Sequence, residues 1–150
     1  MTHRVLDLRS IDEVIAELDR LQASGYQREG NWSLGQICRH LSIFVQGSMD
    51  GFNGPRLPWY VRVMAPLFVW WMRKKRRMPT GVRVPAAYAP GDHADDAGEV
   101  ALLKGLLRRF ELHQGPLHPS PFGGGIEPDE CLDIHLIHCS HHLSFLQPNT

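Results

Sequence analysis

Apolar residues recur at helical spacing in several separate stretches of the chain, and polar signals mark the ends of these stretches. The first stretch follows a capping box, Ser10-Ile-Asp-Glu13, and its apolar positions lie three or four residues apart: Ile11, Val14, Ile15, Leu18 and Leu21. Gly25 is a stop signal for this helix. A second helix is predicted at about 33–50, where Asn31-Trp-Ser33 opens an apolar arc: Leu34, Ile37, Leu41, Phe44 and Val45.

Two further helices are predicted in the second half of the chain. One runs from about Asp96 to His113, with Asp96-Ala-Gly-Glu99 resembling its cap; the other runs from Pro128 to about Leu146, before Pro148. Long loops at 79–91 and 115–125 precede them, and no stretch has a convincing strand pattern. We therefore predict an all-α fold, a single four-helix bundle domain over residues 1–150 with one additional or broken helix.

The additional helix corresponds to the strongly apolar run from Leu57 to Met72. The run is too short to span a membrane and is interrupted by Arg62 and Pro66, so it predicts a buried helix with a kink near Pro66 rather than a stable membrane insertion. The cations of Arg73 to Arg77 then suit a helix C-terminus. An alternative is that this region binds anionic lipid, nucleic acid or a protein partner, although a solvated helix end is the simpler interpretation.

Composition and charge narrow the class of protein. Lys and Arg number 16 and Asp and Glu also number 16, so no overall field attracts nucleic acid, and we expect no nucleic-acid partner. Cys38, Cys131 and Cys139 form no CxxC pair, and no secretory signal is visible. Reduced thiols in a cytoplasmic protein are the simplest reading.

Histidines supply the candidate chemistry. Four of the nine histidines lie in the last predicted helix: His135, His138, His141 and His142. With His138 set at zero and about 100° per residue, His142 falls near 40°, while His135 and His141 lie near 60° and −60°. His138/His142, His138/His141 and His135/His138 can therefore each face one ion, and the first pair lies nearest the centre of the apolar face.

A metal site needs ligands from more than one element. His40, at the edge of the apolar arc of the second helix, is the best candidate for a third ligand. Three histidines without a fourth protein ligand would leave an open position, as catalytic zinc sites do. The alternative is that these are core histidines without a metal. Cys131, on the same face as His138, is either a ligand, a reactive thiol or inert core. The Gly123–Gly125 run is either a hinge over the site or a permissive turn, and His118 beside it is by default a surface residue.

Three segments resemble one known superfamily. Asn31-Trp-Ser-Leu-Gly-Gln-Ile-Cys-Arg-His40-Leu resembles a conserved motif of the DinB-like superfamily, which includes YfiT-type metalloenzymes. His138-Cys-Ser-His-His142 resembles its C-terminal His-x-x-x-His. His118-Pro-Ser-Pro-Phe-Gly123, followed by Glu127-Pro-Asp-Glu130, resembles a branch known only as a domain of unknown function.

The resemblance implies an up-down-down-up four-helix bundle that holds one divalent metal, usually zinc or nickel. Its three ligands correspond to His40, His138 and His142. Relatives with known activities are transferases and isomerases that use low-molecular-weight thiols such as bacillithiol or mycothiol. The chain departs from them at Leu143-Ser-Phe145, where many have Arg-Gly-Gln, and at Cys131, where Trp is expected. These departures bear on the substrate chemistry more than on the fold or the metal.

Three functions follow, in this order. The first is a metal-dependent enzyme, a transferase or hydrolase, with a thiol-dependent S-transferase acting on small electrophiles as the leading version. The second is a non-catalytic bundle that binds a metal or small ligand. The third is a peripheral membrane or partner-binding protein that uses Trp59 to Arg77. A small-molecule substrate is the expected partner, and a homodimer is an open alternative.

Overall fold

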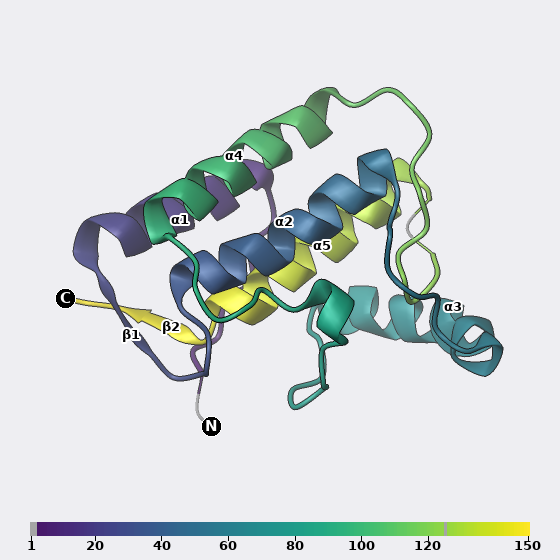
Figure 1. The fold of residues 1–150 in the computed structure, drawn as a ribbon, viewed down its shortest axis with the longest axis horizontal. Coiled ribbons are helices and arrows are strands. Elements are labelled where there is room, and N and C mark those ends of the chain that lie inside the picture. The colour runs from purple at the N-terminus through teal and green to yellow at the C-terminus, as the bar shows by residue number, and fades with distance from the viewer. Residues whose placement is uncertain (1–2, 125) are drawn as a thin grey trace.

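A computed structural model describes residues 3–124 and 126–150, and helices dominate it (Figure 1). The elements in chain order are α1 (Ile11–Ser24), β1 (Tyr26–Arg28), α2 (Leu34–Asp50), α3 (Trp59–Lys75), a short 3₁₀ helix η1 (Ala86–Tyr88), α4 (Asp96–Leu112), α5 (Pro128–Leu143) and β2 (Leu146–Pro148). The predominantly helical fold predicted from the pattern of apolar residues is therefore confirmed.

The helices α1, α2, α4 and α5 form the bundle, and contacts between their ends give the direction of each. At their N-terminal ends α2 and α4 meet where Gly35 N donates to Asp96 Oδ1 at 2.7 Å, and at their C-terminal ends the Arg109 guanidinium lies 2.5 Å from Asp50. These two helices are therefore parallel, and the long excursion that contains α3 and η1 connects them. The helices α1 and α5 run the opposite way, which is the up-down-down-up arrangement (Figure 1).

Apolar side chains of these four helices make one continuous core. Val14, Leu18, Leu41, Leu103 and Leu143 are among its most buried members. Ser10 and Ser33 cap α1 and α2, the two helix starts that the sequence predicts. Only half of the predicted Ser10–Glu13 capping box forms, because Ser10 accepts from Glu13 N while Glu13 Oε2 accepts from Arg9 N, whereas Ser33 forms a complete box with Gln36. The cap of α4 differs from the prediction. Asp95 is the capping residue, which frees Asp96 to accept from Gly35 N and from the Tyr26 hydroxyl.

The structure contains two short strands that the sequence analysis did not predict. The strands β1 and β2 pair antiparallel, with Tyr26 opposite Pro148 and Arg28 opposite Leu146. The last helix consequently ends at Leu143, three residues before the predicted end near Leu146. Strands of three residues are too short for an alternating pattern to be recognised, and the partner of each lies at the other end of the chain.

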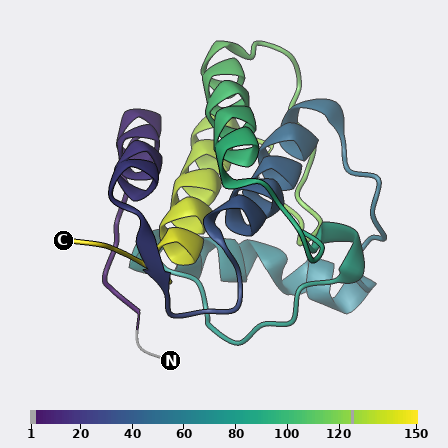
Figure 2. The ribbon, with the colours of Figure 1, turned by 60° about the vertical axis from the view of Figure 1, so that its left-hand side comes forward.

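The expectation of a buried helix at 57–72 is wrong in its burial. The helix forms as α3 with Pro66 inside it, but it lies outside the four-helix bundle and crosses it (Figure 2). Ala65, Val69 and Met72 are buried, whereas 74% of Trp59 and 56% of Trp70 are exposed. A helix that packs on the outside of a finished bundle buries one face, whatever the composition of the other. Among the described residues, no helix is both long and apolar enough to cross a membrane.

Candidate metal centre

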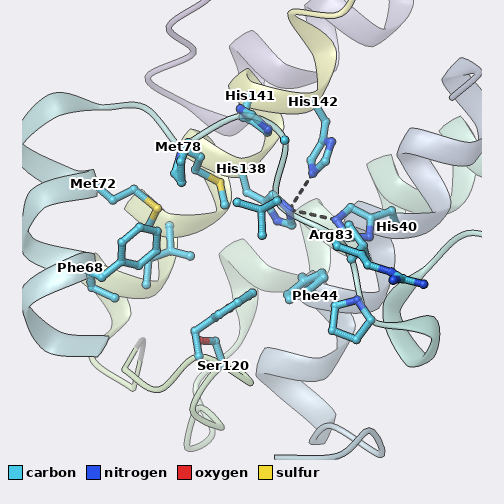
Figure 3. A pocket seen from close by; sticks show the side chains of 18 residues that line it. His40, Phe44, Phe68, Met72, Met78, Arg83, Ser120, His138, His141 and His142 are labelled. Carbon is cyan, nitrogen blue, oxygen red and sulfur yellow. Dashed lines mark hydrogen bonds between the residues drawn. The ribbon is translucent and has the colours of Figure 1, made fainter. Parts of the chain in front are cut away.

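Three histidines from two antiparallel helices meet beside the bundle core. His40 comes from the first half of α2, and His138 and His142 come from the last two turns of α5 (Figure 3). His138 Nε2 lies 3.1 Å from His40 Nε2 and 3.1 Å from His142 Nε2. One nitrogen from each ring lies within 4.8 Å of the other two. Of the three pairs that helical geometry left open, His138/His142 is the one that faces His40.

A backbone carbonyl orients His40. Its Nδ1 lies 2.7 Å from the carbonyl oxygen of Tyr88, the last residue of η1. Because the carbonyl only accepts, Nδ1 carries the ring proton and the lone pair of Nε2 points at His138. Metal-binding histidines are commonly oriented in this way by a second hydrogen bond.

The segment after η1 is itself held against α2. The Arg39 guanidinium donates to the carbonyl oxygens of Pro90 at 3.1 Å and His93 at 2.7 Å. The same guanidinium bonds the Glu99 carboxylate of α4 at 2.7 and 2.9 Å. Arg39 thus joins α2, α4 and the segment that directly follows Tyr88.

The three ring nitrogens have too few protons to bond one another. His40 keeps its proton on Nδ1, so each 3.1 Å contact must use a proton from His138 or His142. If His138 Nε2 carries a proton, it can donate that proton to one of the other two nitrogens but cannot accept a hydrogen bond from His142. If it carries no proton, it can accept from His142, but its lone pair then faces the lone pair of His40. At most one well-aligned hydrogen bond therefore joins the three nitrogens. A cation that accepts all three lone pairs would satisfy them, and nitrogens bound to tetrahedral zinc at about 2.05 Å lie about 3.3 Å apart.

Burial keeps these rings neutral, which is the form that binds metals. The pKa of His40 is lowered by desolvation, partly offset by the hydrogen bond to Tyr88. Desolvation lowers the pKa of His138 and His142 well below the usual value, and the charges that neighbouring histidines would carry lower it further. Adding a proton to one of the rings, so that a second hydrogen bond could form between them, is therefore unfavourable. A metal ion would bind the neutral rings directly.

Aromatic rings fix the positions of the three imidazoles. Trp32 stacks on His142 with ring centroids 5.4 Å apart and an interplanar angle of 24°. Phe44 meets His138 edge-on at 4.8 Å and His40 at 5.0 Å. Rings packed this closely have little rotational freedom, so the cluster is held in one arrangement.

The three histidines form one end of an apolar cavity of about 140 Å³. Side chains of α3, the 78–85 segment, the 120–122 turn and α5 line the rest of it, including Phe68, Met72, Met78, Val82, Phe122 and Ile134 (Figure 3). Arg83, Ser120 and His141 are the other polar or charged side chains among the described lining residues. A ligand that reaches the histidines therefore does so through apolar surroundings.

His135 and Cys131 of α5 lie in a separate polar cluster with Ser48 of α2. His135 Nε2 lies 3.0 Å from Ser48 Oγ and 3.4 Å from Cys131 Sγ, so His135 and Cys131 are outside the three-histidine group. Burial lowers the pKa of His135 to about 4 and raises that of Cys131 to about 11. Both are neutral near pH 7, which fits core packing better than reactivity. Cys38 and Cys139 are buried free thiols as well.

His141 and the 118–124 segment lie nearby without joining the group. His141 lines the cavity but has no nitrogen in the three-histidine group, and burial lowers its pKa to about 4. His118 is exposed, and its backbone N–H donates to the Ser48 carbonyl at 2.8 Å. Gly123 and Gly124 have φ values of 94° and 78°, which supports the permissive-turn reading of the glycine run; Gly125 lies outside the described residues.

Several residues that shape the site were not singled out by the sequence analysis. The Tyr88 carbonyl has no sequence signal, because any residue at that position would supply one. In the sequence, Trp32 belongs to a helix-start signal and Phe44 to an apolar arc, and neither pattern indicates contact with a histidine. The positions of Phe68 and Met72 in the cavity wall depend on where α3 packs, which its uniform apolar pattern does not indicate.

These features define a helical-bundle protein with a three-histidine group that could hold a metal ion. The chain belongs to a family of proteins of unknown function, DUF1569, which matches residues 1–149. No curated protein and no solved structure matches it. The family gives no activity, so the functional argument depends on the chemistry of the site.

Proposed function

We propose that this protein is a metal-dependent enzyme of the DinB-like type, with His40, His138 and His142 holding one divalent transition metal, zinc or nickel. The observation that carries the proposal is the convergence of three neutral imidazole nitrogens at the end of an apolar cavity. The resemblance of the segments around His40 and His138 to the DinB-like motifs supports it. Three protein ligands would leave a coordination position open toward the cavity.

The leading reaction is the transfer of a low-molecular-weight thiol to a small electrophile. A bound metal of this kind lowers the pKa of a coordinated thiol or water. In the reaction the S–H proton is released to solvent and the sulfur lone pair forms a C–S bond. The leaving group departs with the electron pair of the bond that breaks. The protein orients the ligands through Tyr88 and Trp32 and excludes bulk water with the apolar wall.

The cavity favours a compact, mostly apolar substrate. Its volume of about 140 Å³ is close to the ~150 Å³ of an engineered apolar cavity that binds benzene. A reacting group of about the size of one small ring therefore fits. Arg83 at the cavity wall is a cation that can bind a carboxylate of the thiol or substrate. Arg83→Ala is expected to raise KM more than it lowers kcat.

One observation favours a second candidate, a non-catalytic protein that binds a metal or a small ligand. The described residues that line the cavity include no Asp or Glu, and His141 is a weak base because its pKa is lowered to about 4. The wall therefore offers no evident general base. This candidate predicts a bound metal without turnover.

Elemental analysis and an activity screen test the proposal together. Untagged protein is expected to contain about one equivalent of a transition metal, lost in His138→Ala and retained in His141→Ala, a neighbouring histidine of the same cavity. The metal-loaded protein is then assayed with a panel of thiols and chromogenic electrophiles. Turnover that is lost in His138→Ala supports the enzyme. Metal without turnover supports the second candidate. No metal after reconstitution refutes the enzyme and the metal-binding form of the second candidate, and leaves only the binding of a small ligand.

A further inference from the structure

The outer face of α3 is apolar, and among the described residues its large side chains are left exposed. Six of its large side chains are at least half exposed: Trp59, Tyr60, Val63, Met64, Leu67 and Trp70. At about 100° per residue they occupy one arc of about 140°, opposite the face that packs on α5. Contiguous exposed apolar surfaces of this kind mark interaction sites, because leaving them in water is unfavourable.

The same region carries a strong local positive charge. Residues 51–91 contain eight Lys and Arg and no Asp or Glu, although the whole chain has equal numbers of each sign. Two of the eight are neutralised by other parts of the protein: Arg73 pairs with Asp133, and Arg76 pairs with Asp7. The other six are exposed and form no ion pair within the described residues: Arg56, Arg62, Lys74, Lys75, Arg77 and Arg83.

Cations and aromatic rings adjoin one another at the end of the helix. Lys74 Nζ lies 4.9 Å from the ring centroid of Trp70, and Lys75 and Arg77 follow within three residues along the chain. Trp and Tyr side chains with neighbouring Lys and Arg are typical of segments that lie in a membrane interface, where the rings enter the headgroup layer and the cations contact anionic lipids.

We propose that α3 is a docking helix for the surface of an anionic lipid membrane. The apolar arc would enter the headgroup and acyl boundary, and the unpaired cations at the C-terminal end of the helix, Lys74, Lys75 and Arg77, would bind lipid headgroups. A second copy of the chain is a poorer occupant of the same face, because it would bring two such sets of cations together without an acidic residue from either 51–91 segment. Nucleic acid would use the cations but leave the apolar arc exposed. This inference is independent of the metal centre.

Vesicle co-sedimentation of the full-length protein tests the proposal. Vesicles of equal parts phosphatidylcholine and phosphatidylglycerol are compared with pure phosphatidylcholine, at low salt and at about 1 M salt, where charges are screened beyond ~3 Å. The protein is expected to bind the anionic vesicles more tightly. The triple variant Lys74→Gln, Lys75→Gln, Arg77→Gln should bind on the order of 100-fold more weakly, at about fivefold per cation.

Substitutions of apolar residues separate docking from a general effect of charge. Leu67→Glu places a carboxylate in the centre of the apolar arc and should abolish binding to anionic vesicles. Leu112→Glu is the matched control, because Leu112 is 81% exposed at the end of α4 and is not part of the α3 arc. Equal binding by Leu67→Glu and Leu112→Glu would overturn the proposal. A lack of binding to anionic vesicles at low salt would also overturn it. A wild-type protein that binds no vesicles but forms a concentration-dependent dimer, which Leu67→Glu dissociates, would show that a second copy covers this face instead.

Discussion

The central position of His138 makes it the most informative ligand to remove. Its Nε2 lies 3.1 Å from the corresponding atom of both other histidines, so His138→Ala leaves only two candidate ligands, His40 and His142, without the nitrogen that lies between theirs. In the metal-free protein the substitution also removes the contact in which a ring nitrogen of His138 has no hydrogen-bonding proton to share with one of its neighbours. The substitution also leaves a cavity at a buried position, so the variants are compared by the change in Tm that zinc produces in each and not by their metal-free stability.

The expected response follows from linkage. Zinc at about 100 times its Kd stabilises a protein by about 2.7 kcal/mol if it binds the folded state alone. For a chain of 150 residues, a stabilisation of 1 kcal/mol raises Tm by about 2–4 °C, so wild-type Tm should rise by about 5–11 °C. With two ligands, His138→Ala should gain less than about 1 kcal/mol at the same zinc concentration, which is a shift of a few degrees at most.

Calorimetry or far-ultraviolet circular dichroism with increasing zinc, reversed by a chelator, measures these shifts. His141→Ala is the control, because it removes a histidine from the same cavity but leaves the three-histidine group intact. The reasoning is refuted if His138→Ala keeps the full shift, or if His141→Ala loses it as well. An unchanged Tm in the wild-type protein would show that the three imidazoles are a structural cluster.

Three further predictions concern the surroundings of the site. Arg39→Ala removes the hydrogen bonds that hold the segment after Tyr88 against α2. It should weaken zinc binding about tenfold in a competition titration without changing the metal stoichiometry. An unchanged affinity would show that the Tyr88 carbonyl is held by other contacts. Gly35→Ala places a Cβ 2.9 Å from the Ala94 carbonyl oxygen and should lower the free energy of unfolding in urea by about 1–3 kcal/mol. Gly105→Ala, in open space on α4, should raise it by up to about 1 kcal/mol; similar effects of the two substitutions would contradict this account. Burial lowers the pKa of His135 from an ordinary 6.5 to about 4, so the folded state favours the neutral ring. This preference contributes fully to the free energy of unfolding above pH 6.5 and is lost as the pH falls toward 4, with an upper limit of about 3 kcal/mol. The unfolding free energy of metal-free His135→Leu should therefore fall less steeply with pH over that range, and a slope equal to that of the wild type would exclude this source of acid sensitivity.

Local patterns were enough to predict the bundle helices. Spaced apolar residues and caps such as Ser10 and Ser33 act within a few positions of the chain, so the helices could be predicted without knowledge of their neighbours. The same holds for His138 and His142, since a spacing of four residues places two side chains on one face of a helix. Their meeting with His40 was inferred in part from the resemblance to DinB-like proteins, and the structure brings the three rings together.

The features that were missed depend on contacts between distant segments. The strands Tyr26–Arg28 and Leu146–Pro148 exist because they pair with each other across nearly the whole chain. The burial of α3 was mispredicted because an apolar composition shows that a helix avoids water but not what it packs against. Asp96 was expected to be part of a cap, and its contacts with Tyr26 and Gly35 became visible only when the helices were placed together.

The two parts of the candidate site come from different structural units of the chain. The histidines belong to α2 and α5, which are fixed by the bundle core, whereas much of the cavity wall comes from the 51–91 excursion outside that core. Substitutions at 78–85 can therefore change which molecules are admitted while the Tyr88 carbonyl, later in the same excursion, still orients His40. In the enzyme proposed above, such a division would let substrate preference diversify without a change in the three histidines. Exchange of residues 78–85 between relatives is expected to transfer selectivity, because this segment forms one side of the cavity and contributes none of the three histidines.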